Sequence, residues 1–197
     1  MAEAPDGGEL FDGEGAGFGE VPLAANALLM QFFVLAGYFL DGFATAAEQL
    51  AGRAVGARYR PAFDRAVRLT TGWGLAIALP VSALYFFAGP AIIDTLTTSP
   101  EVRESARTYL VWAALTPLAG VVAFQMDGIF IGATWSRDMR NMMLVSLAVF
   151  LIACMVLTRA FGNHGLWAAL LIFLGARSTV FAWRMRRLLP ATFPPAS

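Results

Sequence analysis

The sequence predicts an all-α integral membrane protein with about five transmembrane helices. Of its 197 residues, 58% are apolar and 14% are charged, against about 45–50% and about 25% in soluble domains. Five stretches are nearly free of charge and long enough for a hydrocarbon core about 30 Å thick, which takes roughly 20 helical residues. The apolar fraction excludes a disordered linker, and the single Cys154 excludes a disulfide framework.

The spans follow from the uncharged runs, taken in chain order. The expected spans are 21–40 with apolar character continuing to about residue 50, 69–93, 108–126 continuing to about 134, 141–158, and 165–183. The last is the weakest, because Arg177 interrupts it. Helix-breaking and polar residues at 58–61, 98–100, 136–138 and 162–165 predict the connecting loops. Pro80 and Pro117 fall inside spans and predict kinks, because neighbouring membrane helices can satisfy the freed carbonyls.

The charges divide the chain into three parts and predict its orientation. Residues 1–20 hold six acids and no base, which predicts an acidic, glycine-rich extracytoplasmic tail without a secretory signal. All 14 basic residues are arginines, and they concentrate in the loop after the first span, in the third loop and near the C-terminus. This asymmetry predicts a plasma (inner) membrane protein with a membrane bundle over 21–190, a cytoplasmic tail over 191–197 and the N-terminus outside.

The absence of lysine excludes a Walker phosphate loop and Schiff-base chemistry.

Three acids within the predicted spans are candidates for proton or cation coupling: Asp127, Asp41 and Glu48. A charge at the centre of a membrane helix costs about 2.5–3.5 kcal/mol on insertion scales, so each acid needs a compensating role. Asp127 follows 19 uncharged residues. The alternative is that Asp41 and Asp127 are interface acids, hydrogen-bonded to other helices or paired with an arginine. For Glu48, near the arginine-rich end, this alternative is a salt bridge with Arg53 or a neighbour.

At about 100° per residue, the first span carries a polar stripe that we call the α-stripe: Gln31, Tyr38, Asp41, Thr45, Glu48 and Gly52. Such a stripe would not face lipid, so it predicts contact with other helices or a water-filled cavity. Polar candidates to line a substrate cavity are Gln31, Tyr38 and Thr45, with Thr116 on the third span. Two glycine pairs spaced by four predict close helix packing: Gly52 with Gly56, and Gly128 with Gly132.

The other candidates for chemistry are weak. His164 lies in a Gly-Asn-His-Gly segment without a second histidine or cysteine nearby, so we expect a solvated residue and no metal site. Cys154 is expected to pack in an apolar run. The tryptophans lie mostly near span ends, as interfacial anchors do, and the basic residues are juxtamembrane, with no nucleic-acid surface.

Three blocks of residues resemble a known family. The runs 23–30 (LAANALLM), 40–48 and 52–58 (GRAVGAR) resemble a second-half helix of the multidrug and toxic compound extrusion transporters, in the DinF-like branch. The run 124–134 (FQMDGIFIGAT), followed by Arg137 and 139–141, resembles the tenth helix and its following loop. Gly165-Leu166-Trp167 and Arg177 resemble the final helix. The likeness covers about residues 15–190.

The resemblance implies helices eight to twelve of a twelve-helix antiporter made of two six-helix halves. It implies export of amphipathic or cationic small molecules coupled to H⁺ or Na⁺, with no other cofactor. Asp127 matches the tenth-helix acid implicated in cation coupling in sodium-type members, whereas DinF-like coupling is associated with an acid of the first helix. The resemblance also implies that the partners are the lipid bilayer, a missing N-terminal lobe and a drug-like substrate, and that the chain is inactive alone.

Two alternatives remain open at this stage. The first is a truncated, non-transporting membrane protein or a small membrane subunit that binds partner helices. The second is an intramembrane aspartyl enzyme that uses Asp41 and Asp127. An aspartyl enzyme requires two acids that share a site, and no motif spacing supports one, so the protein is not expected to be an enzyme.

Overall fold

The computed structural model describes residues 19–194 as a bundle of five long helices. They are α1 (Glu20–Gly56), α2 (Arg60–Leu96), α3 (Pro100–Gly132), α4 (Ser136–Phe161) and α5 (Asn163–Thr192). All five are long and apolar enough to cross a membrane, which confirms the predicted fold class. The expected tail over 1–20 lies almost entirely outside the described residues, as do the last three residues of the tail over 191–197.

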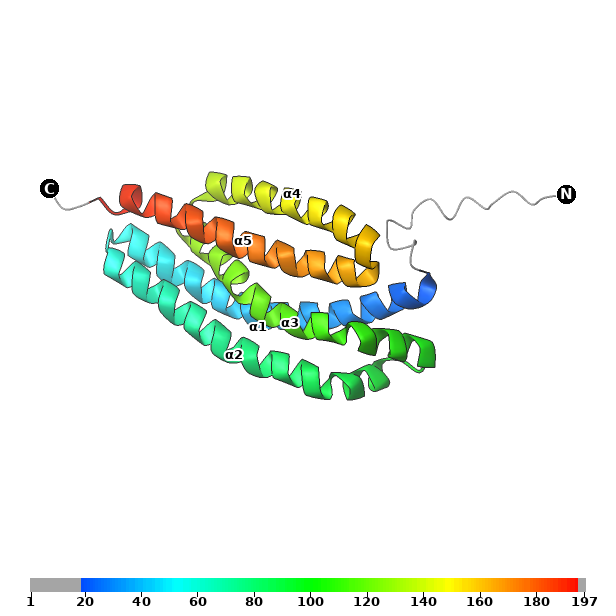
Figure 1. Cartoon of the computed structure of the whole chain (residues 1–197). Coiled ribbons are helices and arrows are strands. Elements are labelled where there is room, and N and C mark those ends of the chain that lie inside the picture. Colours follow the sequence, from blue (N-terminus) through cyan, green and yellow to red (C-terminus); the bar gives the residue numbers. More distant parts are fainter. Residues whose placement is uncertain (1–18, 195–197) are drawn as a thin grey trace, which may run out of the picture.

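The helices run side by side, and the short connections make chain neighbours antiparallel (Figure 1). They extend further than the uncharged runs: α1 and α2 have 37 residues each, or about 55 Å at 1.5 Å per residue. The extra turns are charged, and they stay helical because backbone hydrogen bonding does not require an apolar environment. The described ends of the chain, at the start of α1 and after α5, lie at opposite ends of the bundle (Figure 1).

Two breaks overlap the loops predicted at 58–61 and 98–100, but the predicted loop at 136–138 is wrong. Those residues form the first turn of α4, because the chain turns earlier, where Thr134 has a φ of 60°. The chain leaves the helix at 57–59, at 97–99 and at 133–135, and Pro61 and Pro100 occupy the first turns of α2 and α3. The predicted loop at 162–165 is wrong in extent, because Gly162 alone breaks the helix with φ 56°, a left-handed conformation that suits glycine. Pro117 stays inside α3, which changes direction along its length (Figure 1).

The core consists of apolar clusters stacked along the bundle. Phe32, Tyr85 and Ile93 pack at one end, and Phe63, Phe130 and Phe181 at the other. α1 and α3 form the most extensive helix pair and α2 packs on both. α4 packs mainly on α5, and among the described residues Ser146 is its one buried residue. The exposed apolar side chains of α4 are available to lipid, whereas Met139, Met142 and Met143 pack against the core.

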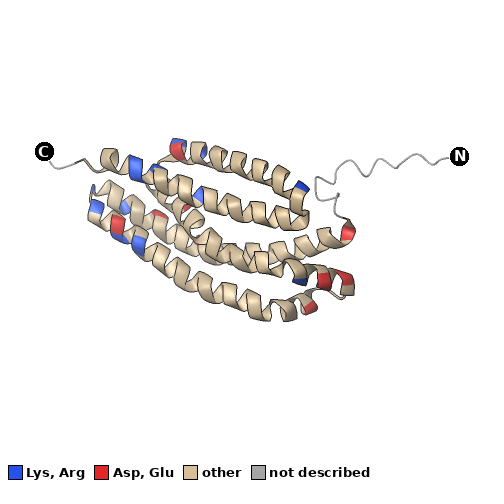
Figure 2. Cartoon of the chain, in the orientation of Figure 1, with Lys and Arg blue, Asp and Glu red and all other residues tan. Residues whose placement is uncertain are grey.

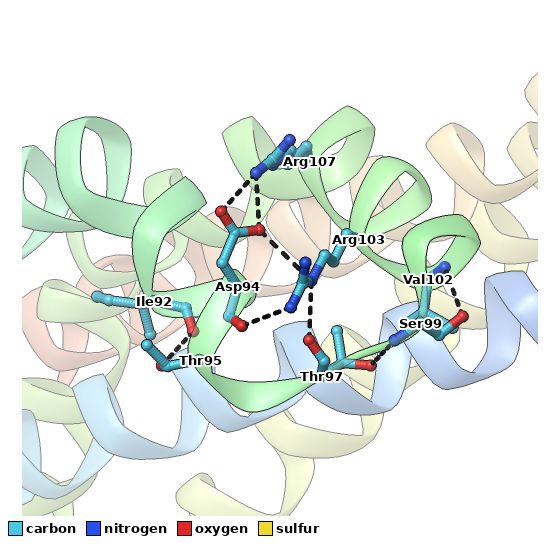
Figure 3. Close-up of polar contacts among 8 residues, drawn as sticks. All are labelled: Ile92, Asp94, Thr95, Thr97, Ser99, Val102, Arg103 and Arg107. Atoms are coloured by element: carbon cyan, nitrogen blue, oxygen red, sulfur yellow. Dashed lines mark hydrogen bonds and ion pairs between the residues drawn. The ribbon is translucent and has the colours of Figure 1, made fainter.

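Arg103 joins the end of α2 to the start of α3 (Figure 3). Its Nε donates to the Thr97 carbonyl at 2.8 Å and its Nη2 to the Asp94 carbonyl at 2.9 Å, so it satisfies acceptors at the α2 C-terminus. Arg107 pairs with the Asp94 carboxylate at 2.7 Å, and Arg103 Nε lies 3.7 Å from the same carboxylate. Ser99 caps α3 by accepting from the Val102 amide at 3.5 Å.

Arg103→Ala is expected to destabilise the chain more than Arg107→Ala. The first change removes two hydrogen bonds to backbone carbonyls, worth about 1–2 kcal/mol together. The second removes an exposed ion pair, worth under about 1 kcal/mol. Unfolding by SDS in mixed micelles measures both losses, and hydrogen exchange should rise in the last turn of α2 for Arg103→Ala. Equal losses in the two variants would contradict this assignment.

Candidate functional site

The centre of the candidate site is an ion pair between α3 and α5. Arg177 Nη2 donates to Asp127 Oδ2, and the side chains are 13% and 19% exposed. Asp127 Oδ1 and Arg177 Nε are buried and have no hydrogen-bond partner among the described residues. The guanidinium also lies 5.9 Å from the centroid of the Phe173 ring. The pair neutralises two charges within the membrane spans, and it leaves one acceptor and one donor free.

The sequence interpretation did not identify Arg177 as the partner of Asp127. Pairing with an arginine was the alternative considered for this acid, and the structure places the acid in such a pair. A signal for it was present: Arg177 interrupts the predicted fifth span, and intramembrane charges of opposite sign commonly pair.

The α-stripe lies mostly on the open surface of α1. Gln31, Tyr38, Asp41 and Thr45 are exposed, and Tyr38 reaches 70%. Among residues 19–194, no hydrogen bond or ion pair engages the Asp41 side chain. Residues 19–194 therefore leave this polar surface of a membrane helix uncovered.

Two of the four predicted cavity residues line one hollow between α1 and α2. Gln31 and Tyr38 contribute to it, and the hollow has a volume of about 370 Å³. Its other walls are mostly apolar: Phe32, Val34, Leu35, Tyr85, Ile92 and Leu96. The Tyr85 hydroxyl is occupied, because it donates to the Phe32 carbonyl at 2.9 Å. Apolar walls with polar groups at one side suit an amphipathic molecule.

The other two cavity candidates lie elsewhere. Thr45 is exposed further along α1 and does not line this hollow. Thr116 departs from its prediction, because it is 1% exposed and its hydroxyl donates at 2.7 Å to the Ala113 carbonyl of its own helix. Its polar group is satisfied within α3, so it needs neither a cavity nor a ligand.

Three of the four predicted packing glycines form the seam between α1 and α3. A Cβ at Gly128 would lie 1.9 Å from the Ala44 carbonyl oxygen, and one at Gly132 would lie 2.1 Å from that of Glu48. A Cβ at Gly52 would lie 3.1 Å from the Gly132 carbonyl oxygen. Gly56 differs, because a Cβ there would meet nothing within 4 Å among the described residues. The backbones therefore approach closely beside Asp127.

The structure does not support the salt bridge considered for Glu48. Its side chain is half-buried, and none of the described arginines pairs with it, Arg53 included. The seam brings its backbone carbonyl against Gly132. Glu48 is thus held by the packing of α1 on α3, and its carboxylate is free of any described partner.

A polar cluster between the starts of α1 and α5 was missed by the sequence interpretation. Asn26 and Asn163 exchange side-chain hydrogen bonds of 2.7 and 2.9 Å, and Trp167 Nε1 donates to Asn26 Oδ1 at 2.9 Å. His164 is exposed as expected, but it accepts a 3.0 Å hydrogen bond from Trp112 Nε1. Within the described residues, no cluster of metal-ligating side chains occurs.

Gln125, two residues before Asp127 in α3, was also missed. It is fully buried, and neither side-chain amide atom has a hydrogen-bond partner within residues 19–194. Its Nε2 lies 3.4 Å from the position of a Cβ at Gly74 on α2. The amide is thus unsatisfied at the α2–α3 contact, where a buried polar group is costly.

Comparison with known proteins places these features in a family. The sequence model of the MatE family matches residues 15–157. DNA damage-inducible protein F of Escherichia coli (strain K12) is 39% identical over 172 residues, which are 86% of this chain and 37% of that protein. Protein DETOXIFICATION 44, chloroplastic, and Protein DETOXIFICATION 42, both of Arabidopsis thaliana, are 24% and 28% identical over 85% of this chain and 32% of their own lengths.

The chain thus spans about a third of the length of the curated relatives it matches. The family match covers more than half of the chain, and it confirms the resemblance expected from the runs at 23–58 and 124–141. This chain belongs to the MatE family, the multidrug and toxic compound extrusion proteins, and is a multi-pass membrane protein similar to the DinF-like branch.

Proposed function

We propose that the chain is the C-terminal lobe of a cation-coupled antiporter that exports amphipathic or cationic small molecules. The observation that carries the proposal is the uncovered α-stripe: Gln31, Tyr38, Asp41 and Thr45 are exposed on a helix long enough to span the membrane. Polar groups at membrane depth are tolerated where they line water or protein. A second lobe opposite α1 would convert this face into a water-filled passage.

The coupling step assigned to this lobe is an exchange of partners at Asp127. In one state the carboxylate is neutralised by Arg177, as in the described pair. In the other, H⁺ or Na⁺ takes the place of the guanidinium, and Arg177 moves away. The unpaired Oδ1 gives the incoming cation an acceptor before the ion pair opens. Asp41 adds a second negative charge on α1, one turn before Ala44, whose carbonyl lies against Gly128 beside Asp127.

The hollow between α1 and α2 is the proposed contact for the exported compound. Its aromatic and aliphatic walls offer apolar burial, and Gln31 and Tyr38 lie at its polar side. Aromatic faces also attract organic cations. The partners implied are therefore the bilayer, an N-terminal lobe and a drug-like molecule.

The orientation proposed places the arginine-rich end in the cytoplasm. Figure 2 shows most of the arginines at the end of the bundle where α1 ends and α2 begins, and several acids at the opposite end. Basic residues are retained on the cytoplasmic side during insertion. Impermeant thiol labelling of single cysteines at position 58 and position 98, in a Cys154→Ser background, distinguishes the two sides. Labelling of position 58 from outside would reverse the proposed topology.

The transport proposal is tested in vesicles energised with a proton or sodium gradient. The chain is produced alone and together with the N-terminal part of the E. coli relative that this chain does not match. Ethidium efflux is expected from the pair and not from the chain alone, because one lobe leaves the α-stripe open. Efflux by the chain alone would refute the half-transporter proposal. Assembly of the pair without efflux would favour the alternative, a non-transporting subunit.

A further inference from the structure

The arginine-rich end of the bundle carries more positive charge than the described residues neutralise. Among the described residues, Arg60 pairs with Asp64 at 3.7 Å and Arg184 with Asp138 at 2.6 Å. The other arginines at this end have no carboxylate partner within the described part of the chain: Arg53, Arg58, Arg65, Arg68, Arg137, Arg140, Arg186 and Arg187. A surface with this surplus attracts an anionic partner.

Arg68 is the arginine of this group that borders the uncharged part of α2. The residues from 69 to 93 carry no charge, so Arg68 marks the boundary between the basic end and the apolar span. Arg65 precedes it by three residues, on the same side of the helix, and both are exposed. Two positive charges are therefore placed where lipid headgroups meet the hydrocarbon.

Two shallow hollows meet at Arg68. One lies between α2 and α5 and is lined by Phe63, Asp64, Val67, Arg68 and Met185. The other runs along α2 towards the membrane centre and is lined by Arg68, Leu69, Gly72, Trp73 and Ala76. Asp64, the one acid in these walls, is already paired with Arg60. The positive charge of Arg68, which can contact a lipid headgroup, thus adjoins an apolar track along α2.

Gly72 and Trp73 shape the apolar track. Among residues 19–194, no neighbouring atom lies within 4 Å of the position of a Cβ at Gly72, so the missing side chain leaves an open notch on the helix surface. Trp73 is 64% exposed and stands beside the notch. Tryptophan at an interface presents an apolar ring to acyl chains, with its N–H free for the headgroup region.

We propose that this surface of α2 is a binding site for an anionic phospholipid. The phosphate group contacts Arg68, with Arg65 adding positive potential, and one acyl chain lies in the Gly72 notch against Trp73. An anionic headgroup is favoured over a zwitterionic one because the latter carries its own positive charge next to the phosphate, facing the surplus arginines. The proposal does not depend on transport or on the identity of a second lobe.

Native mass spectrometry of the purified chain tests the site, with phosphatidylglycerol and phosphatidylcholine of identical acyl chains as probes. Phosphatidylglycerol adducts are expected to survive to higher collision energy. Arg68→Gln should weaken phosphatidylglycerol binding about fivefold, the contribution of one basic residue near the surface. Arg159→Gln at the opposite end of the bundle, also exposed and without a described carboxylate partner, is the matched control and should change nothing.

Two further measurements test the acyl-chain contact and the headgroup preference separately. Gly72→Leu fills the notch without a clash in the chain, so it should weaken retention of both lipids while the protein stays folded. The fluorescence of Trp73 is the difference between the spectra of the unchanged chain and of Trp73→Phe. Brominated phosphatidylglycerol should quench this Trp73 fluorescence more strongly than brominated phosphatidylcholine does. Equal binding of the two lipids, unchanged binding in Arg68→Gln, or full displacement by inorganic phosphate would overturn the proposal.

Discussion

Replacing Gly128 by alanine is expected to prevent the chain from accumulating as a folded bundle. The added Cβ would lie 1.9 Å from the Ala44 carbonyl oxygen and 2.7 Å from its carbonyl carbon, so the α1 backbone would have to move. Overpacking against side chains costs about 1–3 kcal/mol, and a clash with a helix backbone should cost at least as much. The measurement is the folded fraction in SDS titration and the monodisperse yield after extraction.

Gly56→Ala is the matched control, because Gly56 belongs to the other glycine pair but faces open space. It should leave the yield unchanged or raise stability, since alanine is a better helix former than glycine by about 0.8–1.0 kcal/mol. Normal folding of Gly128→Ala would show that the seam between α1 and α3 is looser than described. A similar loss in both variants would point to a general effect of the added methyl group.

Removing the negative charge of Asp127 is expected to damage both folding and transport, and the two effects can be separated. Asp127→Asn leaves the Arg177 guanidinium without its partner in a largely buried position. Breaking a buried pair from one side costs about 3–5 kcal/mol, with less expected here because both side chains keep some exposure. The double variant Asp127→Asn with Arg177→Gln removes both charges and should recover most of the membrane abundance.

Ion-coupled efflux by the assembled two-lobe protein should stay lost in the double variant, because no carboxylate remains at position 127 to bind the cation. Asp41→Asn is expected to give a moderate transport defect and Glu48→Gln a small one. The measurements are membrane abundance by immunoblotting and ethidium efflux per unit of protein. Wild-type efflux by the double variant would leave the Asp127–Arg177 pair with a structural role alone.

The sequence predicts the helices well because one physical requirement, apolar length, determines where a membrane span can lie. The run at 69–93 needs no partner to be recognised, and α2 contains it entirely. Helix ends are less predictable, because charged turns such as those around Arg60 remain helical outside the apolar region. The loop at Gly162 is shorter than the sequence predicts, because one residue in a left-handed conformation suffices to turn the chain.

The site is less predictable because it depends on how the helices are rotated against one another. The intramembrane positions of Asp127 and Arg177 are visible in the sequence, but their contact requires α3 and α5 to present these residues to each other. The same limit explains Thr116, whose hydroxyl turns back to its own helix. It also explains Asn26 and Asn163, which are 137 residues apart and form reciprocal hydrogen bonds.

The attachment of α4 has a consequence for how the bundle comes apart. α4 is tied mainly to α5, through a turn in which the backbone near Leu157 lies against Gly165. In a bilayer, lipid chains replace lost apolar contacts at little cost, so peeling α4 from the bundle sacrifices van der Waals packing and the partly exposed Arg184–Asp138 ion pair. α4 therefore opens at lower free energy than the rest of the bundle, in which α5 stays attached to α3 through the Arg177–Asp127 pair and the packing of Phe181 on Phe130.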